Sequence, residues 1–136
     1  MQTISEPSSI FHLAIPTHDL LAAKQFYIDF LGCQLAREYA DRITLDFFGD
    51  QLVCHLDPDA IEPEPKMYPR HFGRTFLSES DFTRIVAAAK QHNIRFLQEP
   101  SERFPDRPER HLTMALLDPS NNVVEVKYYF VAAYIY

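Results

Sequence analysis

The sequence predicts an α+β protein in which a βαβββ unit occurs twice. Short apolar runs rich in β-branched and aromatic residues, typical of strands, are interrupted by two stretches with apolar residues every three to four positions. The same order of runs appears on both sides of a proline-rich segment, which indicates an internal repeat. The 136 residues are 46% hydrophobic and 24% charged, as in a single globular domain. We expect one domain with modules at about 10–57 and 71–130 and a linker at 58–70.

The first module begins with a strand at Ile10–Pro16. Asp19 is placed to cap a helix, and Gly32 to end it in the left-handed conformation. The apolar residues of this helix recur at helical spacing: Leu20, Ala23, Phe26, Tyr27, Phe30 and Leu31. Three strands follow, with a turn at 48–50 between the last two: Gln34–Tyr39, Arg42–Phe47 and Gln51–Leu56.

The second module repeats this order after Asp57–Pro69, where four prolines and four acidic residues exclude a regular helix or strand. Ser80 is expected to cap the second helix, which runs from Asp81 to about Asn93. A polar loop is expected at Glu99–Glu109. The predicted strands are His71–Leu77, Ile94–Gln98, His111–Leu117 and Val123–Phe130, the last two joined by a turn at 118–122.

Two such modules predict a concave ligand site. Each small sheet has one face covered by its helix and a second face left open, so two copies side by side form mixed, curved sheets around a shared cup. A concave interior of this kind is where a small-molecule ligand is expected.

The composition excludes several classes of partner. A net charge of −6 lacks the basic surface that nucleic-acid binding requires, and no apolar run reaches the roughly 18 residues that span a bilayer. Cys33 and Cys54 form no CxxC pattern, which favours free thiols in a reducing compartment. We therefore expect a cytoplasmic protein that binds neither nucleic acid nor membranes.

Polar residues inside the apolar strands point to a metal site, because such positions are costly unless they have a role. The first and last strands of the two modules each carry one metal-competent side chain: His12, His55, His71 and Glu125. Three imidazoles and one carboxylate suit one divalent ion (Fe, Ni, Mn, Co or Zn) and leave positions open. Taken singly, a strand histidine is more often a hydrogen-bonded structural residue, and Glu125 is equally explained by solvation or by pairing with Lys127.

The sequence resembles the vicinal oxygen chelate superfamily, which includes glyoxalase I, type I extradiol dioxygenases and bleomycin-resistance proteins, from Ile10 to about Tyr129. The resemblance is carried by His12-x6-Asp19-Leu20 with Phe26-Tyr27 and Leu31-Gly32, by His71-Phe72-Gly73, and by Asp118-Pro119 with Asn121-Asn122 and Glu125. It implies one ligand on the first and fourth strand of each module, again His12, His55, His71 and Glu125. Glyoxalase I usually has Glu where His55 stands here, and Asn121 replaces a usual Gly.

The resemblance implies a metal-dependent enzyme of the glyoxalase or extradiol-dioxygenase type, which chelates a small substrate through two adjacent oxygens. The reaction is a dioxygenation or a lyase or isomerase step, with Glu125 as a catalytic group. His111 is expected to line the cup and transfer protons, or else to be a histidine at its rim. The alternative function is a ligand-sequestering protein without catalysis, like the bleomycin-resistance branch.

Two further segments have alternative interpretations. The arginines in and beside the polar loop (Arg103, Arg107 and Arg110) either form a lid for an anionic substrate or are simply solvated. The C-terminal Tyr128–Tyr136 has five aromatic residues and no charge, so we expect it to pack on the core or on a second subunit. A homodimer is therefore expected.

Overall fold

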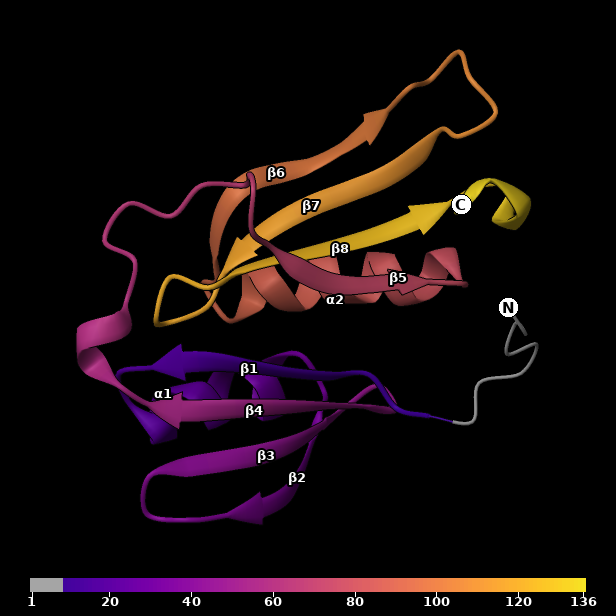
Figure 1. Cartoon of the computed structure of the whole chain (residues 1–136). Coiled ribbons are helices and arrows are strands. Elements are labelled where there is room, and N and C mark those ends of the chain that lie inside the picture. Colours follow the sequence, from indigo (N-terminus) through magenta and orange to yellow (C-terminus); the bar gives the residue numbers. More distant parts are fainter. Residues whose placement is uncertain (1–8) are drawn as a thin grey trace, which may run out of the picture. The chain divides into compact units, whose positions relative to one another are not determined.

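The computed structural model describes residues 9–136 and confirms two βαβββ modules. The chain forms two compact units, one ending at Ile61 and the other spanning Glu62–Tyr136 (Figure 1). The elements of the first unit are β1 (His12–Thr17), α1 (Leu20–Lys24), η1 (Gln25–Phe30), β2 (Gln34–Glu38), β3 (Arg42–Phe47), β4 (Asp50–Leu56) and a short 3₁₀ turn, η2 (Pro58–Ala60).

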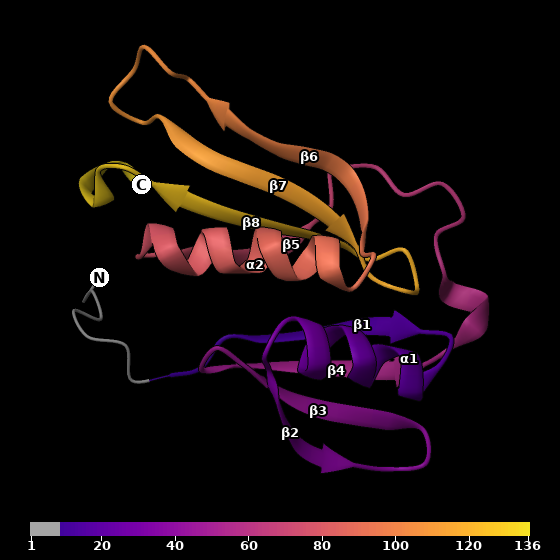
Figure 2. The same cartoon turned by 180° about the vertical axis from the view of Figure 1, so that it is seen from behind.

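The first unit is a four-stranded sheet in the order β1-β4-β3-β2, with a helical segment on one face (Figure 2). β1 and β4 run parallel, whereas β3 is antiparallel to both β4 and β2. Ile43, Leu45, Leu52 and Cys54 are fully or almost fully buried, and they form the core of the sheet. His12, Gln51 and His55 belong to the alternate positions of these strands, on the opposite face.

The first helix starts as predicted but changes its winding. The Asp19 carboxylate accepts hydrogen bonds from the backbone N–H groups of Leu21 and Ala22, which confirms the cap. From Gln25 onward the helix is a π-helix rather than the expected continuous α-helix, with Leu31 N–H donating to the Phe26 carbonyl at 2.9 Å. The wider turn lets the adjacent rings of Phe26 and Tyr27 both reach the core, where they contact each other edge-on. Gly32 ends the helix with φ +90°, as expected.

The second unit repeats the arrangement, in the strand order β5-β8-β7-β6. Its elements are β5 (Phe72–Phe76), α2 (Glu79–Gln91), β6 (Arg95–Arg103), β7 (His111–Leu117), β8 (Val123–Tyr129) and a 3₁₀ turn, η3 (Ala132–Tyr134). α2 lies along β5 and β8 (Figures 1 and 2), and its buried residues are Phe82, Ile85 and Ala89. It covers the apolar face formed by Met114, Leu116, Val124 and Val126. The alternate face carries the polar side chains of Thr113 and Glu125 beside a small apolar cluster of Met67, Ala115 and Val123.

Several boundaries in the second unit differ from the prediction, most of all the start of α2 and the end of β6. The helix begins at Glu79, so Ser78 and not Ser80 occupies the cap position. β6 continues to Arg103 through residues predicted as loop, because Ser101 and Arg103 pair with Thr113 and His111 of β7. The strand lies at the edge of the sheet, where Pro100 needs no backbone donor. Cross-strand hydrogen bonding has overridden the local turn preference of this segment.

Both cysteines are free and buried, and the thiol of Cys33 is expected to be unreactive. Burial, and secondarily the nearby Asp46 carboxylate, raises the Cys33 pKa to about 12. Since only the thiolate is nucleophilic, we expect iodoacetamide at pH 8 to leave Cys33 unmodified in the folded protein but to alkylate it readily in guanidinium. Mass spectrometry of the tryptic peptides measures this. Rapid modification of Cys33 in the native protein would contradict the assigned environment.

Among residues 9–136, no helix is long and apolar enough to cross a membrane.

Candidate metal site

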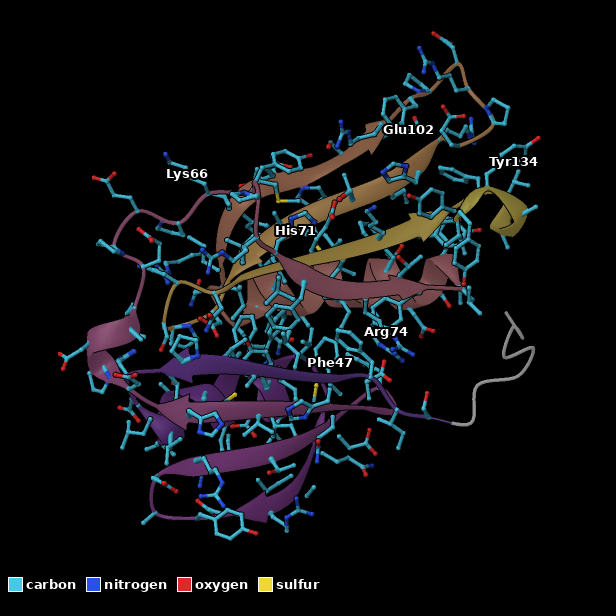
Figure 3. All side chains as sticks on the ribbon, viewed as in Figure 1. Phe47, Lys66, His71, Arg74, Glu102 and Tyr134 are labelled. Carbon is cyan, nitrogen blue, oxygen red and sulfur yellow. The ribbon has the colours of Figure 1, made fainter. Side chains whose placement is uncertain are left out.

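The open face of the second sheet carries a buried carboxylate paired with an imidazole. Glu125 on β8 is only 7% exposed, and one of its oxygens, Oε2, accepts a 2.6 Å hydrogen bond from the Thr113 hydroxyl of β7. Its other oxygen, Oε1, lies 3.1 Å from Nε2 of His71. His71, labelled in Figure 3, directly precedes β5, the strand that runs parallel to β8. The parallel pairing of β5 and β8 therefore brings together two residues that are 54 positions apart in the sequence.

The protonation of His71 makes this pair suited to a cation. Its Nδ1 lies 2.7 Å from the Met67 carbonyl oxygen, which can only accept, so Nδ1 carries a proton. In the neutral ring Nε2 is then unprotonated, and its lone pair faces the Glu125 carboxylate. Two acceptors at this distance need a proton or a cation between them. A hydrogen bond from the remote nitrogen to a backbone carbonyl is also how metal-bound histidines are commonly oriented.

The first unit contains a corresponding pair, His12 and Gln51. The register of β1 and β4 sets these residues opposite each other, and Nδ1 of His12 lies 2.6 Å from the amide oxygen of Gln51. Since an amide oxygen accepts, Nδ1 carries the proton here as well, and Nε2 keeps its lone pair. His12 is exposed, so this lone pair is accessible to a ligand.

The structure does not bring His55 to His12, which corrects the expectation that the two imidazoles lie at one site. His55 pairs with Pro16, four positions along β1 from the His12–Gln51 row, or about 13 Å at the usual rise per residue. His12 begins β1 whereas His55 is near the end of β4, and parallel strands align start with start. Gln51 is not among the ligands predicted from the sequence. It shares a strand face with His55, and only the parallel pairing of β1 and β4 identifies it as the partner of His12.

The described residues thus contain two pairs of side chains suited to an ion site, His12 with Gln51 in the first unit and His71 with Glu125 in the second. Within residues 9–136, no three His, Cys, Asp or Glu side chains are close enough together to hold a metal ion. The donor chemistry nevertheless fits a divalent ion of the N/O-binding type. The two pairs offer two imidazole lone pairs and one carboxylate oxygen, and no thiolate, while the Gln51 amide oxygen accepts from Nδ1 of His12 and orients its ring.

His111 lies on the open face of the second sheet, apart from the His71–Glu125 pair. It is 4% exposed, stacks on the Tyr129 ring with centroids 4.4 Å apart, and donates from Nδ1 to the Glu109 carbonyl at 2.9 Å. The register places it four positions along the strand from Glu125, with the Thr113–Lys127 pair halfway between them on the same face. Its Nε2 is therefore the nitrogen left to accept a proton.

Comparison with solved structures finds the same fold in several proteins. A glyoxalase/bleomycin resistance protein/dioxygenase from Alicyclobacillus acidocaldarius is 53% identical, with a TM-score of 0.89, and the match covers 98% of this chain and 100% of that one. The lactoylglutathione lyase of Agrobacterium tumefaciens is 20% identical (TM-score 0.68, 90% and 94% covered). The fosfomycin resistance protein FosX of Listeria monocytogenes is 12% identical (TM-score 0.74, 96% and 100% covered). The latter two show a common fold only.

The search of curated proteins gives no match. A family model described as the Glyoxalase/Bleomycin resistance protein/Dioxygenase superfamily matches residues 9–126, which include both pairs and nearly all of both sheets. Together with the repeated βαβββ units, this match shows that the chain belongs to the glyoxalase/bleomycin resistance protein/dioxygenase superfamily.

Proposed function

We propose that the protein is a metal-dependent enzyme that binds one divalent ion through His12, His71 and Glu125, with Gln51 orienting the His12 ring, and that chelates a small substrate through two adjacent oxygens. The observation that carries the proposal is the His71 lone pair facing the Glu125 carboxylate at 3.1 Å, with the opposite ring nitrogen held by Met67. His55 is left out of the proposed set because Gln51, and not His55, is the residue paired with His12.

When bound, the ion would supply Lewis acidity to the two adjacent oxygens of an enolate, enediolate or catecholate-like substrate. The protein residues then have separate roles. The Thr113 hydroxyl holds one Glu125 oxygen and so aims the other at the site, and the Met67 carbonyl fixes the tautomer of His71. We assign proton transfer to Nε2 of His111, whose other nitrogen is occupied by a backbone hydrogen bond.

We also propose that the enzyme acts as a homodimer. Val131, Tyr134 and Tyr136 in the C-terminal segment are exposed, which is costly for aromatic and aliphatic side chains unless a second copy covers them. Sedimentation analysis is expected to give twice the mass of the chain.

Metal analysis of the untagged protein tests the proposal. We expect about one equivalent of Fe, Ni, Mn, Co or Zn per chain, and tight rebinding of one of these ions after chelation, measured by calorimetry. A protein that takes up no divalent ion but binds aromatic drugs normally would instead support sequestration without catalysis. An activity screen with catechols, thiohemiacetals and fosfomycin, each with several ions, separates dioxygenase from lyase, isomerase and addition chemistry.

Substitutions in the first unit distinguish Gln51 from His55. We expect His12→Ala and Gln51→Ala each to weaken ion binding, by roughly tenfold or more, because each removes a ligand or its orienting partner. His55→Ala is the matched control on the same strand and the same face, and it is expected to bind the ion like the unmodified protein. Isothermal titration with Mn²⁺ or Ni²⁺ measures all three. A loss confined to His55→Ala would contradict the register-based ligand set.

A further inference from the structure

A chain of side-chain contacts leads from the His71–Glu125 pair to an arginine at the end of β6. The Tyr68 ring packs edge-on against the His71 ring, with centroids 5.8 Å apart. The Tyr68 hydroxyl accepts a hydrogen bond from Nη1 of Arg103 at 3.4 Å. Tyr68 therefore bridges the proposed ion ligand and the Arg103 guanidinium.

A second chain of contacts returns from Arg103 to Glu125 by another path. The guanidinium lies 5.0 Å from the centroid of the Phe104 ring, and Phe104 contacts the ring of His111 edge-on. His111 stacks on Tyr129, whose hydroxyl lies 3.3 Å from the Lys127 ammonium. Lys127 in turn is 3.9 Å from Glu125. The two paths enclose one region of the open face, with aromatic rings around it and a cation on each side.

Among the described residues, Arg103 differs from the other arginines of this region in having no carboxylate partner. Arg107 lies 3.7 Å from Glu109, and Arg110 lies 3.7 Å from Glu102 and 4.1 Å above the Phe130 ring. For Arg103, the contacts within the described part of the chain are the Tyr68 hydroxyl and the Phe104 ring. An exposed guanidinium placed on aromatic rings and free of internal anions keeps its paired donors available for an external carboxylate.

The surrounding charge also favours an anion. The region contains the cations of Arg103 and Lys127 against the single carboxylate of Glu125, which already accepts from Thr113. If a divalent ion is bound to Glu125, the positive charge increases further. A negatively charged group would thus be stabilised by the local field, and a flat ring would have aromatic side chains to stack on.

From these contacts we propose that Arg103 is a specificity-determining residue that binds the carboxylate of an anionic, ring-containing substrate, while the adjacent oxygens of that substrate reach the ion. The proposal rests on the proposed function and adds the substrate class to it. The proposal also assigns different roles to the three arginines in and beside the loop. Arg103 recognises substrate, whereas Arg107 and Arg110 form ion pairs with neighbouring residues.

Binding of a matched acid and ester tests this assignment. The probes are 3-(3,4-dihydroxyphenyl)propanoate and its methyl ester, titrated without oxygen into Mn²⁺-loaded protein. The acid is expected to bind roughly tenfold more tightly than the ester, as for a charge-assisted bidentate contact, and the two to bind equally in Arg103→Gln. Arg103→Lys, which keeps the charge but not the planar fork, is expected to give an intermediate ratio. Arg110→Gln is the control and should keep the full ratio.

The outcomes separate this proposal from the one on the ion. Mn²⁺ affinity is measured first on every variant and is expected not to change in Arg103→Gln. If the protein binds no Mn²⁺, the proposed function fails, and 3-phenylpropanoate with its methyl ester, followed by NMR on the metal-free protein, tests Arg103 alone. An acid-to-ester ratio that is the same with and without Arg103, or that falls equally in Arg110→Gln, overturns the assignment.

Discussion

Glu125→Gln is expected to weaken divalent-ion binding by at least roughly a hundredfold while leaving the fold intact. The amide keeps the size of the side chain and still offers an oxygen to the Thr113 hydroxyl, so the packing of β7 and β8 is preserved. What disappears is the negative charge beside the His71 lone pair. Calorimetric titration with Mn²⁺ and Ni²⁺ measures the affinity, and circular dichroism the fold.

Glu102→Gln is the control for Glu125→Gln. It removes a carboxylate from the same sheet, at an exposed position where its partner is Arg110. Ion binding by this variant is expected to equal that of the unmodified protein. If Glu125→Gln bound the ion as tightly as Glu102→Gln, the pair formed by His71 and Glu125 would be an ordinary hydrogen-bonded ion pair and not half of a metal site.

Gly73→Ala is expected to be the most destabilising single-atom addition in the second unit, at about 3 kcal/mol. A Cβ at residue 73 would overlap the backbone carbonyl of Glu125 on the neighbouring strand, and backbone atoms cannot move aside as a flexible side chain can. β5 and β8 would have to separate at the row that holds Glu125. Thermal unfolding should show a midpoint lower by roughly 10 °C.

Ion binding gives a second measurement on Gly73→Ala. Since the displaced backbone belongs to Glu125, the affinity for Mn²⁺ is expected to fall together with the stability. Thr75→Ala, a truncation two residues further along β5, is the control and should retain both properties nearly unchanged. An unfolding midpoint for Gly73→Ala equal to that of Thr75→Ala would contradict the close approach of the two strands.

The order of elements could be predicted because the apolar pattern of each segment reports which face it buries. The predicted bounds of Arg42–Phe47 and His111–Leu117 coincide with β3 and β7, both central strands with strong apolar character. The edge strand β6 was predicted too short, because residues 99–103 have the composition of a loop and are held extended only by their partners on β7. The winding of η1 was likewise set by packing of its aromatic residues.

Part of the candidate site could also be predicted from the apolar pattern of the strands. His12, His71 and Glu125 stand out as polar residues in apolar strands, and alternation assigns them to faces. Alternation does not say which position of one strand lies beside which position of another. The register of β1 and β4 supplies this information, and it makes Gln51, and not His55, the partner of His12. The register of β5 and β8 likewise gives Gly73 its role, since the glycine is needed only because the backbone of Glu125 passes beside it.

The sequence by itself determined the two βαβββ modules, the helix-facing core and the residue types available for binding an ion, because these follow from local periodicity and composition. The tertiary structure decided which of those residues meet, which nitrogen of His71 and of His12 is free, and which of three arginines lacks a carboxylate partner among the described residues. These depend on strand register and on contacts between residues far apart in the chain, and such distances are fixed only when the sheets form.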